Sequence, residues 1–500
     1  MVDYIDGGLW PQIGGDIQHE RDVIIEELYS VALTEDGSKL FIGEGSEGKV
    51  SIYNYSDTND TYSLSDEFNV GERFGQSLAV SGDGNIFIAG NYFNEAFTGM
   101  ATVYELVSGT WNQKGTSIFG EVLGDFLGYS VSISGDGDRI AIGVPYFDPN
   151  DEFDTGIVQT FEWDSETSDW AKFGGNIVGE AAGDRSGINI AMSKDGNSVA
   201  IAATFNDGEG TNQRNTGQVR VYACSITLIW TQQGGDIDGL LEYSGNPLQV
   251  DISADGRAVV VGYPSADDDK GNVVAYELVQ TGTILDEINN NLGIDIDFDF
   301  LENFPILDPI LADPGLVIVS EWSQYGDVLT GEASGDLFGS SVSMSDDSTA
   351  IFIGAPQVVN STHAGVGLVF SYNEQSETWD FASSDSSTEA FNTAMSGDGH
   401  TIATLSTSFT QIFKFRFDSE SPSLSPTTSR PPSLAPSISN APTINVSLLD
   451  RIMDFLTNNA QWWWLILIAL PIISVFVGVS IIVPSFFLLV VGAIVVRENF

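Results

Sequence analysis

One short segment recurs seven times along this 500-residue chain, and SVSISGDGDRIAIG at Ser130–Gly143 is a representative copy. On both sides of its central Asp-Gly, apolar residues alternate with polar or small ones, as at Val131, Ile133, Ile140 and Ile142. Alternation with period two is typical of strands with one buried face, and Asp-Gly of a tight reversal. Each copy therefore predicts a β-hairpin. The Asp of the turn falls at Asp36, Asp83, Asp136, Asp195, Asp255, Asp346 and Asp398.

Two further signatures accompany the hairpins in a fixed order. One is a strand after glycine, such as GIVQTFEW, and the other opens with an aromatic residue, as in WAKFGGNI. Each unit thus holds about four short strands, and most of the turn Asp residues lie 47 to 60 residues apart. Four-stranded units repeated roughly four to eight times are typical of a β-propeller. We expect an all-β fold, a seven-bladed propeller over residues 9–418.

The two ends of this region complete each other. The chain begins with a copy of the aromatic signature, Trp10–Ile17, which no earlier hairpin precedes. The last unit has a hairpin at Asp398 and a strand at Phe409–Phe417, but no aromatic segment follows it. We therefore expect Trp10–Ile17 to supply the outer strand of the last blade, which closes the ring without an unpaired blade.

One gap between turns, from Asp255 to Asp346, is much longer than the others. It indicates an insertion over residues 282–320, between the third and fourth strands of one blade. Within it, Asp295, Asp297 and Asp299 alternate with apolar residues and would share one face of a strand. The glycine and glutamate of a common calcium loop are missing there, which favours a polar strand face over a metal site.

The composition changes after the repeats. Residues 419–446 are rich in Ser, Thr and Pro and predict a disordered stalk. Residues 447–461 read as a short amphipathic segment. Residues 462–496 carry no charge and exceed the roughly 20 residues that cross a bilayer, so they predict a single transmembrane helix, with a hairpin bent at Pro484 as the alternative.

The N-terminal residues have neither the basic region nor the apolar region of a signal peptide. Two topologies follow. In the first, the gene model lacks an N-terminal signal, and the propeller is extracellular or lumenal. In the second, the chain is a tail-anchored protein with a cytosolic scaffold propeller. We favour the first, and Arg497 beyond the span is consistent with a cytoplasmic C-terminus.

The formal net charge of −52 excludes binding of nucleic acid or anionic membrane surfaces through charge, because both would repel the chain. It suits a solvated acidic surface or loosely held divalent cations. Calcium is the one cofactor that the sequence suggests.

The segments GDFLGYSVSISGDGDRIAIGVP from Gly124 and GDLFGSSVSMSDDSTAIFIGAP at Gly335–Pro356 resemble the FG-GAP family of propeller repeats. The resemblance covers nearly all of residues 9–418, although several copies are degenerate. It implies the seven-bladed propeller of integrin α chains, and with it an adhesive or ligand-binding module. The family often holds calcium in an acidic loop between the first two strands of a blade. Here that loop has shrunk to a short turn.

The repeated turn Asp is expected to have a structural role, because single carboxylates on separate blades cannot converge on one ion. Calcium is more plausible in two irregular acidic loops, since hard cations prefer several oxygen ligands. Their candidate ligands are Asp148, Asn150 and Asp154 in one loop, and Asp267 and Asp269 in the other. The competing interpretation is a solvated acidic loop. The three histidines share no ligand spacing, so no zinc site is expected.

Four Asn-x-Ser/Thr sequons, at Asn54, Asn59, Asn360 and Asn445, would be glycosylated only in the secretory pathway. Together with the stalk and the apolar tail, they predict a membrane-anchored cell-surface protein whose propeller binds a protein or glycan ligand without catalysis. A propeller hydrolase is the less favoured alternative, because no nucleophile, base and orienting group stand out together.

Overall fold

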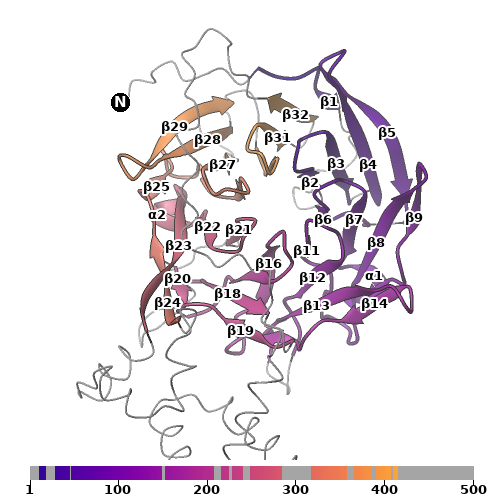
Figure 1. Ribbon diagram of the computed structural model, residues 1–500, viewed down its shortest axis with the longest axis horizontal. Helices are drawn as coiled ribbons and strands as arrows, with labels where there is room; N and C mark the ends of the chain where they lie inside the picture. The colour runs from indigo at the N-terminus through magenta and orange to yellow at the C-terminus, as the bar shows by residue number, and fades with distance from the viewer. Residues whose placement is uncertain are drawn as a thin grey trace, which may run out of the picture. The chain divides into compact units, whose positions relative to one another are not determined.

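Antiparallel pairing joins the strands into seven separate sheets of four or five strands each, the seven blades of an all-β propeller (Figure 1). Blade 1 comprises β2 (Tyr29–Leu33), β3 (Lys39–Glu44), β4 (Lys49–Ser56) and β5 (Thr61–Asn69). Blade 2 comprises β6 (Ser77–Val80), β7 (Ile86–Asn91), β8 (Met100–Val107), β9 (Thr110–Gln113) and β10 (Ile118–Phe119). Blade 3 comprises β11 (Val131–Ile133), β12 (Arg139–Val144), β13 (Ile157–Asp164), β14 (Asp169–Lys172) and β15 (Ile177–Val178).

The remaining blades follow the same order. Blade 4 comprises β16 (Ser186–Met192), β17 (Ser198–Ala203), β18 (Gln218–Cys224), β19 (Trp230–Gln232) and β20 (Ile237–Asp238). Blade 5 comprises β21 (Gln249–Ile252), β22 (Ala258–Tyr263), β23 (Asn272–Thr283), β24 (Val317–Gln324) and β25 (Leu329–Thr330). Blade 6 comprises β26 (Ser341–Met344), β27 (Ala350–Ala355), β28 (Val366–Asn373) and β29 (Thr378–Asp385). Blade 7 comprises β30 (Asn392–Met395), β31 (Thr401–Leu405), β32 (Phe409–Lys414) and β1 (Ile17–Gln18). A single-turn helix, α1 (Asn94–Phe97), and a turn labelled α2 (Ala266–Asp269), in which Asp267, Asp268 and Asp269 have positive φ, lie in loops.

The computed structural model describes residues 11–18, 29–45, 47–71, 73–148, 153–207, 216–224, 228–239, 248–283, 317–356, 365–385, 390–406 and 409–414. All of them belong to one unit, which comprises residues 1–283 and 314–417. Residues 284–313 and 418–500 form a second unit. The expected stalk, amphipathic segment and membrane span, as well as Asp295, Asp297 and Asp299, therefore lie outside the described residues.

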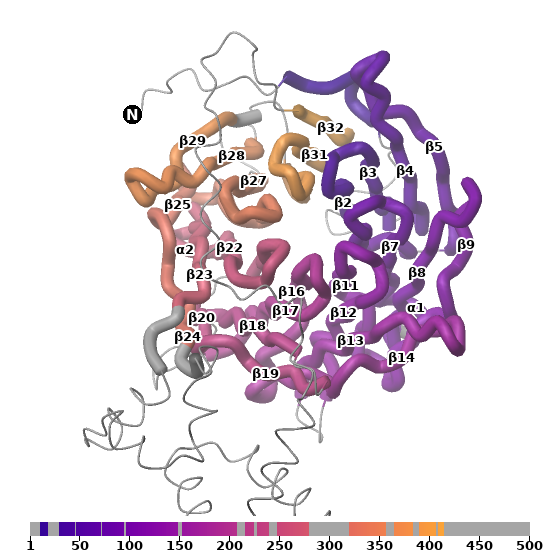
Figure 2. Tube along the Cα trace, viewed as in Figure 1, coloured from indigo at the N-terminus to yellow at the C-terminus, as the bar shows by residue number. Residues whose placement is uncertain are grey.

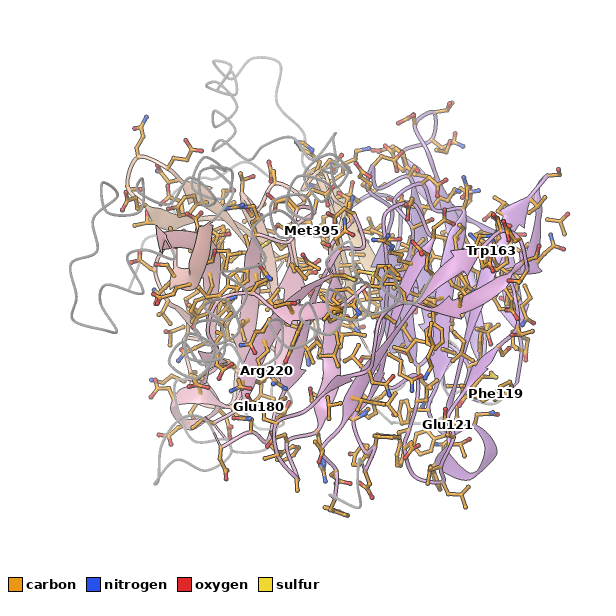
Figure 3. All side chains as sticks on the ribbon, turned by 60° about the horizontal axis from the view of Figure 1, so that its bottom comes forward. Phe119, Glu121, Trp163, Glu180, Arg220 and Met395 are labelled. Carbon is orange, nitrogen blue, oxygen red and sulfur yellow. The ribbon has the colours of Figure 1, made fainter. Side chains whose placement is uncertain are left out.

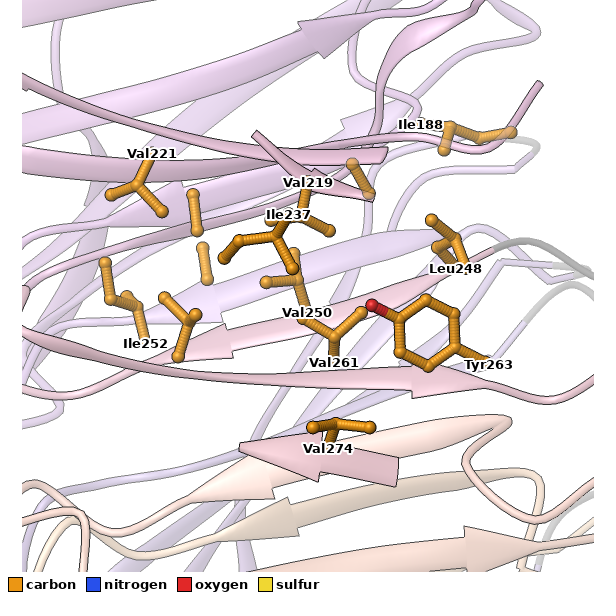
Figure 4. Packing of buried hydrophobic residues seen from close by; sticks show 14 of the residues in the cluster. Ile188, Val219, Val221, Ile237, Leu248, Val250, Ile252, Val261, Tyr263 and Val274 are labelled. Atoms are coloured by element: carbon orange, nitrogen blue, oxygen red, sulfur yellow. The ribbon is translucent and has the colours of Figure 1, made fainter. Parts of the chain in front are cut away.

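The repeated segment forms the two inner strands of each blade, as the alternation predicts. In blade 3, Val131 pairs with Ile142 and Ile133 with Ile140, and all four side chains are at most 8% exposed. Inner strands of neighbouring blades contact one another all the way round the ring (Figure 2). The contact of β2 with β30 closes the circle. Apolar clusters fill the space between adjacent sheets. Figure 4 shows the one between blades 4 and 5, which includes Val219, Val250 and Val261.

The N-terminal segment closes the ring, which confirms the prediction from Trp10–Ile17. In β1, Ile17 pairs with Thr410 and Gln18 with Phe409 of β32. Upstream, the Ile13 N–H donates to the Ile412 carbonyl at 2.8 Å, and the Ile13 side chain is 1% exposed between blades 7 and 1.

The turn Asp of each hairpin stabilises the turn itself. In the representative copy, Asp136 Oδ1 accepts from the Ser134 hydroxyl and from the Asp138 N–H, at 2.6 and 3.0 Å. The same pair of bonds recurs in all seven hairpins, with one correction to the sequence alignment. In blade 6 the Ser345 hydroxyl and the Thr349 N–H donate to Asp347, not to Asp346. The prediction of Asp346 was wrong by one position because two Asp residues stand side by side.

The residue before each turn Asp links its blade to the next. Seven backbone N–H···O=C bonds of 2.8 to 3.1 Å join these hairpin turns into a closed circle. Six are donated by the residue at this position, and the seventh is donated by Asp398 to the Glu35 carbonyl. The residues at this position are Glu35, Gly82, Gly135, Lys194, Ala254, Asp346 and Gly397. Four of the seven are glycine or alanine, so only three long side chains reach toward the centre of the circle.

The aromatic signature forms an outer strand that connects neighbouring blades. In the four Trp-x-x-x-Gly copies of blades 2 to 5, the glycine has a positive φ and a tryptophan of the next blade packs on it. A Cβ on Gly174, whose φ is +72°, would lie 2.9 Å from Cδ1 of Trp230. The indole N–H of Trp230 donates to the Phe173 carbonyl at 3.3 Å, and Trp170, Trp322 and Trp379 bond the preceding blade in the same manner.

Candidate functional site

The connections between strands gather at two opposite faces of the propeller. In an antiparallel blade, the turns after the first and third strands lie at one end, which we call the turn face. The loops after the second and fourth strands lie at the other, the loop face. Figure 3 shows Phe119, Glu121, Glu180 and Arg220 toward one edge, and Trp163 and Met395 toward the other. Because these loops vary in length and sequence between blades, a specific site is expected on the loop face.

Five large apolar side chains are exposed on the loop face of blades 2 and 3, in the β7–β8 loop, at the end of β10, in the β10–β11 connection and in the β12–β13 loop. We call them the loop patch: Phe97 (43% exposed), Phe119 (49%), Val122 (56%), Leu123 (71%) and Phe153 (69%). Exposed apolar side chains scattered singly are normal, but a group of them on neighbouring loops marks an interaction surface.

The loop that carries Val122 and Leu123 has the same structure as two others. In each, an Asp accepts the N–H three residues before it: Asp125 from Val122 at 3.1 Å, Asp184 from Ala181 at 2.9 Å, and Asp336 from Ala333 at 2.6 Å. Where blade 2 has Val122-Leu123, these loops have Ala181-Ala182 and Ala333-Ser334. The same loop structure forms with small residues at these two positions, so the fold does not require the large apolar pair.

Phe97 occupies a backbone position that aspartate takes elsewhere. The residue two before the glycine of the third strand is left-handed in blades 2, 3 and 5: Phe97 (φ 72°), Asp154 (φ 51°) and Asp269 (φ 62°). Asp tolerates this conformation because its side chain can bond locally, whereas a bulky residue is strained there. An exposed phenylalanine at a strained position is the kind of departure found at functional sites.

Aromatic rings of neighbouring loops pack against Phe97 of the loop patch. The Phe97 and Phe126 rings are 5.3 Å apart, and Phe126 lies 4.7 Å from Tyr146 of the next blade. Phe93 lies 5.2 Å from Phe97. We call Tyr92, Phe93, Phe126, Tyr129 and Tyr146 the aromatic cluster, because each stands within 6.3 Å of another member. Rings packed in this way hold the loops of two blades in fixed positions.

Two arginines stack on the ends of this cluster. The Arg73 guanidinium carbon lies 3.8 Å from the centroid of Phe93. That of Arg185 lies 4.6 Å from the centroid of Tyr146, and its nitrogen is paired with Asp154 Oδ2 at 3.0 Å. Both rings therefore already bind a guanidinium from the chain itself, in a protein with only 18 Lys and Arg residues.

The surroundings of the patch are acidic. Burial raises the pKa of Asp125 to about 6, against the bond from the Val122 N–H, and the nearby carboxylates of Asp148 and Glu121 raise it further. Asp148 and Glu121 are exposed, and no described Lys or Arg forms an ion pair with either of them. The electrostatic potential beside the patch is therefore negative.

The calcium candidates lie in two different loops of this face. In blade 3, Asp148 Oδ1 accepts the Asp154 N–H at 2.6 Å, while the Asp154 carboxylate binds Arg185. Asn150 lies outside the described residues. In blade 5, Asp267 pairs with Lys270 at 3.0 Å, and the Asp269 carbonyl accepts two N–H groups of the following loop. Among the described residues no three acidic, His or Cys side chains form a group that could hold a metal ion. Calcium binding at these loops stays a prediction.

The two described sequons lie together on blade 1. Asn54, near the end of β4, and Asn59, in the β4–β5 turn, are both exposed on the turn face. Glycans attached there would leave the loop face uncovered. Asn360 and Asn445 are outside the described part of the chain.

Reasoning from sequence located the acidic loop at Asp148–Asp154 but missed Phe97, Leu123 and the aromatic cluster. A signal was present, because Val122-Leu123 departs from the Ala-Ala and Ala-Ser of the equivalent loops. The clustering itself has no sequence signal, since Phe93 and Tyr146 belong to different blades.

No family model and no curated protein matches this chain. Among solved structures, hydrazine synthase from Kuenenia stuttgartiensis resembles it with a TM-score of 0.47 and 13% identity, over 80% of this chain and 99% of that one. The propeller assignment therefore rests on the strand pairing described above. Within the described residues, no helix has the length and apolar character needed to cross a membrane.

Proposed function

We propose that this chain is a membrane-anchored surface protein whose propeller binds another protein, without catalysis, through the loop patch. The observation that carries the proposal is the exposure of Val122 and Leu123 in a loop whose structural copies use alanine and serine. Exposing such side chains costs solubility, and the fold does not need them. Aliphatic side chains beside phenylalanines favour a protein ligand over a glycan, because protein interfaces have apolar cores.

The membrane anchor and the orientation are supported by the sequence. The uncharged stretch at residues 462–496 follows a Ser/Thr/Pro-rich segment, an arrangement that would hold the propeller away from a bilayer. Exposure of Asn54 and Asn59 suits an extracellular or lumenal propeller. The GD-x-x-G loops and the hairpin motifs lead us to propose repeats of the FG-GAP type.

Two carboxyl groups near the inner strands have the raised pKa values that are also found in catalytic residues. Burial raises the pKa of Asp251 to about 6, and it also raises the pKa of Asp346. Shifted carboxylates of this kind occur at catalytic sites. Here, however, the Asp251 carboxylate accepts the Met344 and Ile252 N–H groups, and Asp346 pairs with Lys194, so structural contacts account for both groups.

Site-specific photocrosslinking in cells that display the full chain tests the binding surface. A photoreactive residue at Leu123 is expected to yield a discrete crosslinked protein, and one at Ser334, the equivalent exposed position in the loop between blades 5 and 6, is expected to yield none. Equal crosslinking at both positions would refute the loop patch as the binding surface. Glycosidase treatment of the same cells tests orientation, and unmodified Asn54, Asn59, Asn360 and Asn445 would refute the surface location.

A further inference from the structure

The chemistry of the loop patch indicates which kind of protein ligand it would bind. This inference rests on the proposed function. We propose that the loop patch binds a cationic protein segment, in which Arg or Lys side chains lie on the exposed rings of Phe97 and Phe153 between apolar neighbours.

The first argument is that rings of the aromatic cluster bind guanidinium groups in this structure. Arg73 and Arg185 occupy equivalent positions, each left-handed (φ 68° and 54°) and each two residues before a glycine that packs on the preceding blade. Each lies over a ring, at 3.8 Å from Phe93 and 4.6 Å from Tyr146. Between them, the same position is held by Phe126 (φ 59°), whose ring contacts Phe97.

An arginine therefore stacks on a ring on each side of the patch, but no described arginine does so at Phe126, where the patch is exposed. No described Lys or Arg stacks on Phe97, Phe126 or Phe153. The Phe97 and Phe153 side chains are 43% and 69% exposed, so a group from outside can reach the ring faces. A cation from a partner would complete the alternation of arginines and rings that the chain begins.

The second argument is electrostatic. Asp148 and Glu121 stand beside the patch without a described basic partner, while the charge of Arg185 is balanced by Asp154. The whole chain carries −52. Such a field accelerates encounter with a cationic partner and repels an anionic one, including a second copy of this chain. A neutral glycan would use neither the carboxylates' charge nor the aliphatic Val122 and Leu123.

Binding of a defined peptide to the full-length protein in detergent micelles tests this proposal. The probe is a peptide that alternates Arg and Leu, and its control replaces each Arg by citrulline, which keeps the shape but removes the charge. We expect the citrulline peptide to bind at least about tenfold more weakly, and added salt to weaken binding of the Arg peptide.

Variants separate the patch from the general attraction of an acidic protein. Phe97→Ser/Phe153→Ser is expected to weaken binding of the Arg peptide by about tenfold. The matched control, Leu64→Ser/Val70→Ser, removes exposed apolar side chains from blade 1, at 52% and 42% exposure, and is expected to leave affinity unchanged. Thermal unfolding of both variants establishes that they are folded.

Three outcomes would overturn the proposal: equal affinity for the two peptides, equal affinity of the two double variants, or patch-dependent binding of neutral oligosaccharides in place of the Arg peptide. Crosslinking from Leu123 does not depend on ligand charge. If it persists while the peptide results fail, only the ligand class is wrong; if it fails as well, the binding surface is wrong.

Discussion

Lys194 of blade 4 and Asp346 of blade 6 form an ion pair across the circle of hairpin turns, with 2.5 Å between Nζ and Oδ2. Glu35 of blade 1 completes the group, at 3.2 Å from the same nitrogen. These three side chains are the long ones at the seven equivalent turn positions, and one ammonium group lies between two carboxylates. They connect three non-adjacent blades, whereas the backbone bonds of the circle connect only neighbours.

Replacing the shared cation should therefore destabilise the ring. Lys194→Met leaves two carboxylates facing each other, and we expect the free energy of unfolding to fall by about 1–2 kcal/mol, because the groups are partly exposed and screened. Lys172→Met removes the same charge from an exposed position on β14 and should change stability by less than about 0.5 kcal/mol. Denaturant titration measures both. Similar losses in the two variants would mean that only net charge matters.

Protonation of the Asp251 carboxyl group should contribute to the pH dependence of stability. Its pKa is about 6 in the folded protein, raised by burial, against about 3.9 in an unfolded chain. The folded state therefore takes up a proton, so this contribution is fully present below about pH 4 and is lost as the pH rises through about 6. Asp251→Asn should remove that part of the slope. Denaturant midpoints of wild type and variant across this range measure it, and parallel curves would contradict the assignment.

The contact between the outer strands predicts that alanine destabilises the protein at one of two adjacent glycines and not at the other. A Cβ on Gly174 would lie 2.9 Å from Trp230 at a positive φ, whereas Gly175 has nothing within 4 Å of its Cβ position. Gly174→Ala should cost about 2–4 kcal/mol from strain and displaced packing. Gly175→Ala should be neutral within about 0.5 kcal/mol. Thermal unfolding compares them, and near-wild-type stability of Gly174→Ala would show that the tryptophan moves freely.

Because the N-terminal segment closes the ring, truncating one of its side chains should lower the free energy of unfolding substantially. Ile13 is 1% exposed between blades 7 and 1, so Ile13→Ala should cost about 2–4 kcal/mol through lost burial and a cavity. Gln18→Ala, at the exposed end of β1, is the control and should have little effect. Hydrogen exchange of the β32 amides should increase in Ile13→Ala alone. Unchanged protection would mean that the seam does not depend on this segment.

Several elements of this protein were readable from the chain alone. Alternating Val131, Ile133, Ile140 and Ile142 specified the inner hairpin, because the two-residue period of a strand places them on one face. The unpaired aromatic segment at Trp10–Ile17 specified how the ring closes, because a blade without its outer strand leaves an open edge. Local turn chemistry specified the role of Asp136, and it failed at Asp346 only where two Asp residues compete for one position.

Other relationships were decided by the tertiary structure. The Trp-x-x-x-Gly pattern was visible, but that Gly174 receives Trp230 of the following blade depends on how two sheets pack. Phe97, Phe126 and Tyr146 belong to three separate loops, and no period in the sequence relates them. The sequence by itself determined the repeat and its hairpins, because those depend on neighbours along the chain. Only the ring of seven blades decided which loops meet, and therefore where the exposed aromatic surface and the Lys194–Asp346 pair form.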